Sequence, residues 1–359
     1  MKKHIGWPVI IMIIILLGCS LAGLILYRSS TPKVNDIKIG MVLYDGNDPF
    51  IVQTKAYVES YINDQNQKIS RRISIDIEDS ARNQSLQNEQ INQFIANQYD
   101  LLIVNIVERQ DAGMIIDKAQ NADIPVIFFN REPVPQDIAK WEKVYYIGSK
   151  AEEAGRIQGE ILADALDNGL KIDQNKDGKI QYVMLEGEYG HQDAILRTYH
   201  CIKVLEERGY SMENLARDTA MWQRVKGKQK MQEWYELFGE HIEVVMANND
   251  EMALGAIEVL KEKGYFEEDL SIPVLGVDGL EEALQAIEEE TLLGTVFNDS
   301  SEQAKCIVYK VNELTGIPAD SHQFDINTQE ENNYFWIKHR PIIKENIQSV
   351  ENRTLNSKK

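Results

Sequence analysis

The sequence predicts an α/β fold of two doubly wound, Rossmann-like lobes, preceded by one N-terminal membrane segment. Three observations lead to this prediction. The chain has 359 residues, which is too long for one ordinary domain and suits two domains of about 150 residues each. Short β-branched apolar runs alternate with amphipathic helical stretches along the body, a pattern typical of parallel sheets covered by helices on both faces. An uncharged apolar run precedes that body.

The apolar run extends from Trp7 to Tyr27 and follows two lysines. About 20 residues at 1.5 Å each cross a hydrocarbon core of roughly 30 Å, and the basic start places the body outside the cytoplasm. An alternative is a lipoprotein processing site in which Cys19 is lipidated. We favour an uncleaved transmembrane anchor because Leu17 is bulky for such a site. In both cases the body lies on the extracellular or periplasmic face of the cell membrane.

Charge and cysteine content exclude several classes of function. The 38 basic residues face 57 acidic ones, and the net charge of −19 repels a polyanion, so we expect no nucleic-acid partner. The three cysteines, Cys19, Cys201 and Cys306, are far apart in the sequence and fit neither a disulfide framework nor a clustered metal site. We expect Cys201 and Cys306 to pack as small buried apolar groups.

The body begins with a strand expected at residues 37–44 (IKIGMVLY), followed by the turn residues DGNDP and a helix to about residue 65. Similar runs predict strands near residues 72–78, 100–107, 124–129, 144–147, 180–186, 242–247, 273–277 and 294–297. Amphipathic stretches such as AEEAGRIQGEILADAL and EMALGAIEVLKEKG predict the intervening helices. The stretch 344–359 is polar, and we expect a mobile tail.

Polar and aromatic side chains follow most of the predicted strands. In open parallel sheets, ligands bind beyond the carboxyl ends of the strands. The candidates are Asp48, Phe50, Asn130, His191, Asp193, Arg197, Trp222, Asn249, Asp278 and Asn298. Carboxylate, amide and guanidinium groups can each engage two sugar hydroxyls, and aromatic rings accept the apolar face of a sugar. Each residue alone has a structural explanation, such as a helix cap for Asp48 or a turn at Asp278. Their recurrence at one location favours a sugar site.

Six segments of the body carry a family resemblance. They are IPVIFFNREP, GEYGHQDAILR, DTAMW, VVMANNDEMALGA, IPVLGVDGL and GTVFNDSSEQAK. With these motifs in order, the chain from about residue 37 to 325 resembles the D-galactose/D-glucose-binding protein family, which has the type I periplasmic-binding-protein fold. The resemblance implies that a pyranose lies between Phe50 and Trp222, with the other eight candidates around its hydroxyls. Gln192 stands where we expect proline and Pro49 where we expect a polar residue, which leaves the preference between glucose and galactose open.

The same resemblance implies a division of the chain. We assign residues 36–148 and 298–332 to an N-terminal sugar-binding lobe, and residues 149–297 and 333–343 to a C-terminal sugar-binding lobe. Residues 1–35 are the anchor or signal segment with a short linker, and residues 344–359 are the tail.

A second motif is independent of the sugar. Asp173, Asn175, Asp177, Gly178 and Gln181 form the pattern D-x-N-x-D-G-x-x-Q, in which Lys179 can contribute its carbonyl oxygen to a hard cation. The twelfth position holds Met184 instead of glutamate, so by itself the motif is half a calcium loop or an ordinary surface loop. The family resemblance supplies the missing carboxylate at Glu243 and implies structural calcium.

The expected function is sugar binding without catalysis. By family resemblance, a monomeric, membrane-tethered protein delivers glucose or galactose to an ABC importer; alternatively, it signals to a sensor kinase or chemoreceptor. A glycosidase with paired carboxylates such as Asp48 and Asp193 is disfavoured, because Arg197, one helical turn away, is expected to hold Asp193 ionised. A sugar-responsive repressor is disfavoured because a membrane segment, not a helix-turn-helix, precedes the body.

Overall fold

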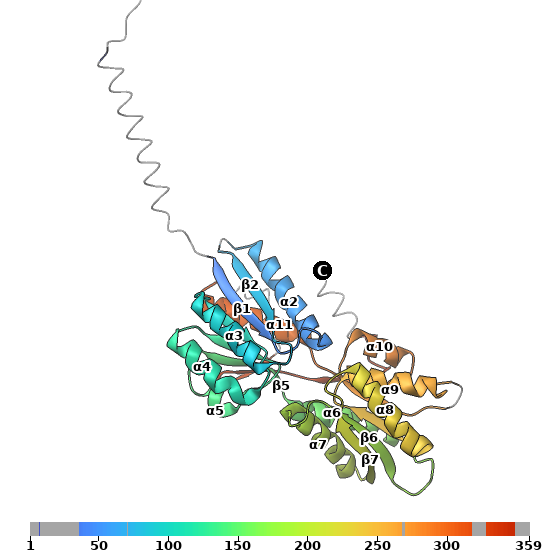
Figure 1. The fold of residues 1–359 in the computed structure, drawn as a ribbon. Helices are drawn as coiled ribbons and strands as arrows, with labels where there is room; N and C mark the ends of the chain where they lie inside the picture. Colours follow the sequence, from blue (N-terminus) through green and yellow to red (C-terminus); the bar gives the residue numbers. More distant parts are fainter. Residues whose placement is uncertain (1–6, 8–35, 70, 268–269, 318–327, 349–359) are drawn as a thin grey trace, which may run out of the picture.

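The computed structural model describes residue 7 and residues 36–69, 71–267, 270–317 and 328–348. Two α/β lobes lie side by side, as Figure 1 shows. The first lobe is built on a seven-stranded sheet of order β11-β12-β5-β4-β3-β1-β2. Its strands are β1 (Ile37–Leu43), β2 (Ile73–Asp79), β3 (Leu101–Val104), β4 (Val126–Phe129), β5 (Val144–Ser149), β11 (Thr328–Glu331) and β12 (Tyr334–Ile337). Its helices are α2 (Pro49–Asn66), α3 (Gln84–Ala96), η1 (Arg109–Asp111), α4 (Ala112–Asn121), α5 (Pro135–Ile138) and α11 (Ser300–Thr315).

The second lobe is built on a six-stranded sheet of order β13-β10-β9-β8-β6-β7. Its strands are β6 (Ile180–Glu186), β7 (Met212–Thr219), β8 (Val244–Ala247), β9 (Val274–Asp278), β10 (Gly294–Phe297) and β13 (Arg340–Ile342). Its helices are α6 (Ala151–Asp167), α7 (Gln192–Glu207), α8 (Arg224–Phe238), η2 (Gly239–His241), α9 (Asp250–Glu262) and α10 (Glu281–Glu288). Strands β1 to β5 and β6 to β10 pair in parallel in the same order in the two lobes, which puts the carboxyl ends of the central strands of each lobe at one edge.

The predicted strands form, and their central residues are buried on both faces because helices cover both sides of each sheet. Strand β7 was not predicted, because its sequence MENLARDT is half exposed at the edge of the sheet and lacks an apolar run. The predicted two-lobed α/β fold is confirmed.

Within the described residues, three segments cross between the lobes. They join β5 to α6, β10 to α11, and β12 to β13. At the crossing the Ser149 hydroxyl donates to Asn298 Oδ1 (3.0 Å), and the backbone N–H of His339 donates to Glu153 Oε2 (3.1 Å). A few crossing residues can therefore absorb the change in backbone angles when the lobes open or close.

The assignment of residues 333–337 to the C-terminal lobe was wrong. Strand β12 pairs in parallel with β5 of the first sheet, with Phe335 opposite Ile147, and only β13 joins the second sheet. The expectation of a polar tail from residue 344 also fails at its start, because Ile347 is buried against the core of the second lobe. Both errors concern packing against residues far away in the sequence.

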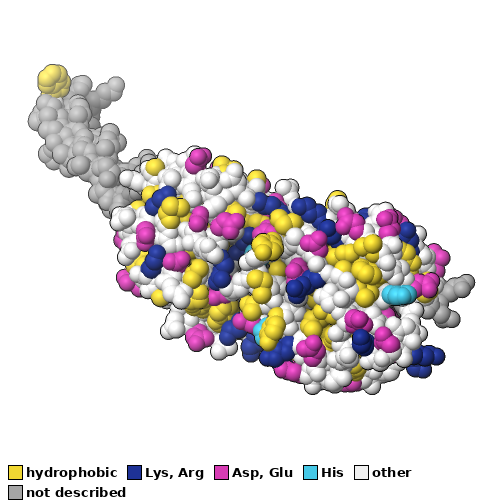
Figure 2. Space-filling model, turned by 60° about the horizontal axis from the view of Figure 1, so that its bottom comes forward, with side chains coloured by type: hydrophobic (Ala, Val, Ile, Leu, Met, Phe, Trp, Pro, Cys, Tyr) yellow, Lys and Arg dark blue, Asp and Glu magenta, His cyan; other side chains and the backbone are white. Residues whose placement is uncertain are grey.

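The predicted anchor at residues 1–35, with Cys19, lies outside the described residues apart from Trp7. Among the residues described, none of the helices combines the length and the apolar character that a membrane crossing needs. Cys201 and Cys306 are free and buried, as predicted. On the face in Figure 2, basic and acidic side chains are interspersed, without a large basic field that would attract a polyanion.

Candidate functional site

Nine of the ten predicted sugar-site residues line one cavity between the lobes. They are Asp48, Phe50, Asn130, His191, Asp193, Arg197, Trp222, Asn249 and Asp278. The tenth, Asn298, is buried at the crossing between the lobes, where it accepts the bond from Ser149 and hydrogen-bonds Asp278. The structure therefore brings the candidates together, while their contacts to a sugar remain a prediction.

Helix N-termini position three of these side chains. Asp48 Oδ1 accepts hydrogen bonds from the backbone N–H groups of Phe50 (3.0 Å) and Ile51 (3.2 Å) at the start of α2. His191 Nδ1 accepts from the Asp193 N–H (3.2 Å) at the start of α7, and Asn249 caps α9. The helix-cap explanation for Asp48 is thus correct, and it is compatible with a binding role because the same side chain faces the cavity.

Three further cavity residues, at or after the ends of strands, have backbone conformations with positive φ. Asn130 has φ 61°, Trp222 has φ 63° and Asp278 has φ 128°. Residues other than glycine adopt positive φ at an energetic cost and usually where the surrounding structure requires it. Here all three positions line the same cavity, so the strained backbone coincides with the candidate site.

Trp222 packs closely over the backbone of the second lobe. A Cβ atom added at Gly187 would lie only 2.0 Å from Trp222 Cζ2, so the ring can occupy this place only because residue 187 is glycine. The His191 ring meets the indole edge-on, with centroids 5.4 Å apart. The indole Nε1 is buried and has no hydrogen-bond partner among the described residues.

Arg197 contributes a second unpartnered donor. Its Nη1 donates to the carbonyl oxygen of Asn248 (2.7 Å), and its Nη2 lies 3.9 Å from Asp193 Oδ2. Its Nε is buried without a partner among the residues described. Because a buried donor without an acceptor costs free energy, the two donors of Trp222 and Arg197 favour a ligand that carries acceptor oxygens.

Burial also raises the pKa of three cavity carboxyls. The pKa of Asp48 and Asp193 is raised by burial, and the pKa of Asp278 is raised well above its usual value by burial and by the charges of Asp250 and Asp48. The Arg197 guanidinium lowers the pKa of Asp193, as expected, but burial has the larger effect and raises this pKa overall. Hydroxyl groups that donate to these carboxylates would offset the lost hydration.

Burial and three neighbouring arginines lower the pKa of His191 well below its usual value. The ring is therefore neutral at pH 7, and because Nδ1 accepts the bond from Asp193 N–H, Nε2 carries the proton. His191 is thus a hydrogen-bond donor to the cavity.

Sequence reasoning missed Tyr44, Ile51 and Arg131, which also line the cavity. Tyr44 donates its hydroxyl proton to Asp48 Oδ2, and the Arg131 guanidinium lies 3.5 Å from the centre of the Tyr44 ring. Tyr44 directly follows β1 and Arg131 is the second residue after β4, so the strand-end rule that found Asn130 could have found both. Tyr44 was instead taken as the last residue of an apolar strand.

The cavity between the lobes is small. Its free volume is about 40 Å³, which is room for only a few water molecules. A sugar ring can therefore enter only when the lobes separate or when lining side chains move.

The predicted calcium ligands gather in the loop before β6. The backbone N–H groups of Asp177 (3.2 Å) and Gly178 (3.0 Å) donate to Asp173, and Gln181 Nε2 donates to Asp177 Oδ2 (2.8 Å). Glu243 reaches the loop from the start of β8 and accepts from the Gln181 N–H (3.0 Å). The oxygen-rich donor set suits a hard cation. No group of three or more His, Cys, Asp or Glu side chains placed to hold a metal occurs within the described ranges.

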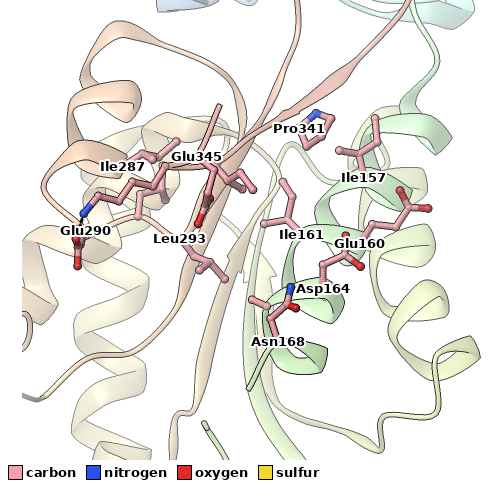
Figure 3. Close-up of a pocket in the computed structure, with 14 residues that line it drawn as sticks. Ile157, Glu160, Ile161, Asp164, Asn168, Ile287, Glu290, Leu293, Pro341 and Glu345 are labelled. Carbon is pink, nitrogen blue, oxygen red and sulfur yellow. Dashed lines mark ion pairs between the residues drawn. The ribbon is translucent and has the colours of Figure 1, made fainter. Parts of the chain in front are cut away.

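A larger cavity of about 660 Å³ lies in the second lobe and has different chemistry. Figure 3 shows Ile157, Ile161 and Leu293 lining it, with Glu160 and Asp164 on α6 beside them. Apolar side chains dominate its wall, and it lacks the convergent amides and arginines of the cleft between the lobes. The cleft is therefore the better candidate for a sugar.

Comparisons with known proteins agree with this geometry. The family model described as "Periplasmic binding protein domain" matches residues 39–316. The D-galactose/methyl-galactoside binding periplasmic protein MglB of Haemophilus influenzae is 39% identical over 280 residues, which cover 78% of this chain and 82% of that protein. A putative rhizopine-binding protein of Rhizobium meliloti is 31% identical over 77% of this chain and 83% of its own length.

Solved structures share the fold. An ABC transporter solute-binding protein from Bacillus halodurans with bound myo-inositol superposes with a TM-score of 0.72 at 26% identity and covers 90% of this chain and 99% of that one.

Proposed function

The chain belongs to the periplasmic binding protein domain family, and on this premise we propose that it binds a monosaccharide of the galactose or glucose type outside the cytoplasm. The predicted membership of this sugar-binding family is confirmed, and so is the prediction that the chain is not an enzyme, because the family consists of binding proteins. The observation that carries the proposal is the convergence of nine predicted residues on one cavity between the lobes.

Both lobes contribute to the proposed sugar contacts. Asp48, Phe50 and Asn130 come from the first lobe, and His191, Asp193, Arg197, Trp222, Asn249 and Asp278 come from the second. A sugar that touches both sets favours the closed form, since only that form completes the contacts. Hydrogen bonds to charged groups contribute about 1.5–3 kcal/mol each, so several of them with ring stacking reach about −8 kcal/mol, near micromolar affinity.

The proposed partner is the membrane component of an ABC importer, which would recognise the closed form. The proposal includes the tether at residues 1–35. Purifying the full-length protein from membranes with and without glucose, and identifying the membrane protein that co-purifies, tests the partner. Recovery of a sensor kinase alone would contradict the importer and support the signalling alternative.

Structural calcium is part of the proposal. Asp173, Asn175, Asp177, Gln181 and Glu243, with the carbonyl oxygen of Lys179, would hold the ion. A cation there would neutralise the acidic loop and join it to the start of β8. It would act as a brace far from the sugar chemistry.

Calorimetry of the full-length protein against pentoses and hexoses tests the sugar site. We expect micromolar binding of glucose or galactose and at least a tenfold loss in Arg197→Gln. The matched control is Arg208→Gln at the end of the same helix, where Arg208 makes exposed ion pairs with Asp164 and Asp167. Absence of binding to every sugar, or equal affinity in the two variants, would overturn the proposal.

A further inference from the structure

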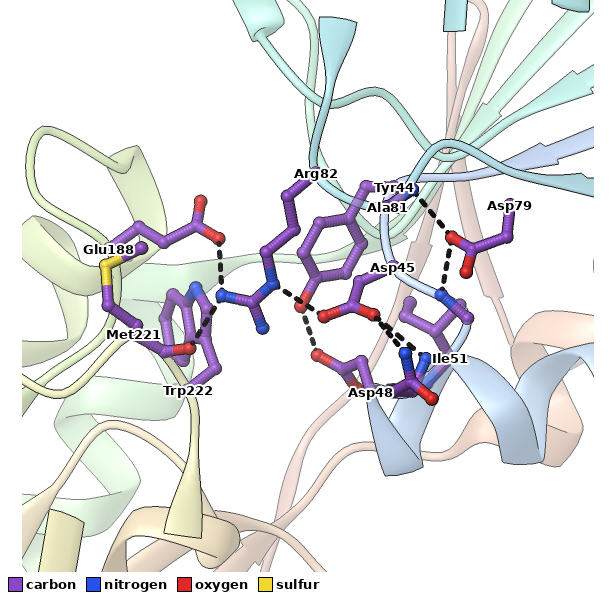
Figure 4. Close-up of polar contacts among 12 residues, drawn as sticks. Tyr44, Asp45, Asp48, Ile51, Asp79, Ala81, Arg82, Glu188, Met221 and Trp222 are labelled. Carbon is purple, nitrogen blue, oxygen red and sulfur yellow. Dashed lines mark hydrogen bonds and ion pairs between the residues drawn. The ribbon is translucent and has the colours of Figure 1, made fainter. Parts of the chain in front are cut away.

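Two arginines of the first lobe contact one carboxylate of the second lobe. Arg131 Nη2 lies 2.9 Å from Glu188 Oε1, and Arg82 Nη1 lies 3.6 Å from the same oxygen. Arg82 Nη1 also donates to the carbonyl oxygen of Met221 (3.1 Å). Figure 4 shows the Arg82 side chain extending between the lobes toward Glu188 and Met221. Neither Arg82 nor Glu188 lines the candidate sugar cavity.

Contacts within the first lobe order the Arg82 side chain independently of its contacts with the second lobe. Its Nε pairs with Asp45 Oδ2 at 2.6 Å, and its backbone is left-handed, with φ 61°. The preceding turn is fixed by Asp79 Oδ1, which accepts from the N–H groups of Ala81 and Gly46, both at 2.8 Å. A side chain that is already ordered loses little conformational entropy when it meets a partner.

Arg131 is ordered in the same way. Its Nη1 donates to the carbonyl oxygen of Val107 (3.0 Å), and its guanidinium stacks on Tyr44. These two contacts lie within the first lobe, so they persist when the lobes separate.

Glu188 is the group whose surroundings change on closure. Its side chain is 18% exposed, against 6% for Arg131 and 23% for Arg82, so the cluster is shielded from most of the solvent and from salt screening. When the lobes separate, Glu188 loses both guanidinium partners. The pairing therefore contributes to closure, and two of its three members, Arg82 and Glu188, lie outside the sugar cavity.

We propose that Arg82, Arg131 and Glu188 form an interlobe latch, which favours the closed form without sugar and determines how slowly a bound sugar leaves. This inference rests on the proposed function, because it assigns affinity-determining residues to the same site. A change in the equilibrium between closed and open forms changes the apparent affinity by up to the same factor. Because release requires opening, a more stable closed form slows the dissociation of a bound sugar.

A fourth contact lies on the same cleft. Gln192 Nε2 donates to Glu132 Oε2 across the lobes (2.7 Å). Gln192 is the position where the sequence departs from the proline expected from the family resemblance. This bond adds to the latch but is not needed for the proposal.

Two measurements on the full-length protein test the latch. Small-angle X-ray scattering gives the radius of gyration without sugar, and stopped-flow tryptophan fluorescence gives the dissociation rate of glucose or galactose. We expect Glu188→Gln to increase the radius of gyration and to speed dissociation about tenfold. The matched control is Glu160→Gln, which removes an exposed ion pair with Arg156 on α6 and should change neither quantity.

A double-mutant cycle identifies the pair. If Arg82 acts through Glu188, Arg82→Gln in the Glu188→Gln background should add little to either effect. Purely additive effects, or a Glu188→Gln variant that matches wild type in both measurements, would overturn the latch. If wild type binds no sugar, the proposed function fails, while the scattering comparison still decides whether the latch exists.

Discussion

The two lobes use the same scaffold for different chemistry. The strand order β2-β1-β3-β4-β5 of the first lobe corresponds to β7-β6-β8-β9-β10 of the second. In both lobes, an asparagine after the third strand along the chain hydrogen-bonds the loop after the first one. Asn105, after β3, accepts at Oδ1 from the Tyr44 N–H after β1 (3.3 Å), and Asn248, after β8, accepts at Oδ1 from the Gly187 N–H after β6 (3.1 Å). The shared framework thus sets where side chains enter the cleft, and residue type decides what they do there.

The corresponding positions differ most where the lobes face each other. Tyr44 in the first lobe corresponds to Gly187 in the second. Arg82 corresponds to Trp222, since both directly precede the N-cap of the next helix and both have left-handed backbones, with φ 61° and 63°. In the second lobe, residue 187 has no side chain, and the Trp222 indole occupies the space. In the first lobe, the corresponding position holds Tyr44, and Arg82 extends across the cleft to Met221.

Filling the space at Gly187 should have the largest effect. In Gly187→Ala the new Cβ would lie 2.0 Å from Trp222 Cζ2 and 2.2 Å from Cη2, so the indole must leave its place. Losing an aromatic contact of this size costs about 2–3 kcal/mol, and we expect hexose affinity to fall about a hundredfold. Titration calorimetry measures the affinity.

The cycle with Trp222→Leu shows whether the indole carries this effect. In the Trp222→Leu background, Gly187→Ala should cost little further affinity, because no indole remains to be displaced. An undiminished loss in that background would mean that Gly187 is needed for a different reason.

Removal of calcium should have the next largest effect, through the loop of the second lobe. An ion present at about 100 times its dissociation constant stabilises the fold by about 2.7 kcal/mol, which corresponds to roughly 5–10 °C in a domain of this size. We expect EDTA to lower the melting temperature and calcium to restore it more than magnesium does. Calorimetric melting of the full-length protein measures this.

Asp177→Asn should abolish most of the response to EDTA. The control Asp218→Asn, which removes a surface carboxylate of the same lobe paired with Lys230, should retain it. If EDTA leaves the wild-type melting temperature unchanged, the loop is an ordinary surface loop.

The second lobe contains a buried carboxyl group, Asp250, that should make the free energy of unfolding depend on pH. Asp250 in the second lobe accepts from Thr295 Oγ1 (2.6 Å) and from the N–H groups of Gly279 (2.7 Å) and Leu280 (2.9 Å), and the corresponding residue of the first lobe is Val107. Burial raises the pKa of Asp250 from 3.8 to about 6. Between these values the folded state binds more protons than the unfolded state, so stability falls as pH rises, by at most about 1.4 kcal/mol per pH unit.

Asp250→Asn should remove the contribution of Asp250 to the pH dependence of the free energy of unfolding. Urea unfolding between pH 4 and pH 6.5 measures the free energy, and the slope of the variant should be flatter than that of wild type. Asp64→Asn, on the exposed surface of α2, is the control. Parallel curves for wild type and Asp250→Asn would contradict the assignment.

The sequence predicted the features that depend on local patterns. Apolar β-branched runs located strands such as β4 and β8, and polar residues after strands located most of the cleft. It did not predict that β12 pairs with β5, because that pairing joins residues about 190 positions apart. It also missed the latch, since whether Arg82 meets Glu188 depends on how two loops face each other across the closed lobes.

The smallest predicted effect comes from the hydroxyl of Tyr44, which has no counterpart at Gly187. Tyr44 donates to Asp48 Oδ2, whose other oxygen is occupied by two backbone N–H groups of α2. Tyr44→Phe keeps the ring under Arg131 and removes only this bond, which is worth about 0.5–1.5 kcal/mol. We expect a three- to tenfold change in hexose affinity by calorimetry, with the melting temperature nearly constant. A loss as large as that of Gly187→Ala would mean that the first lobe, not the second, makes the dominant contact with the sugar.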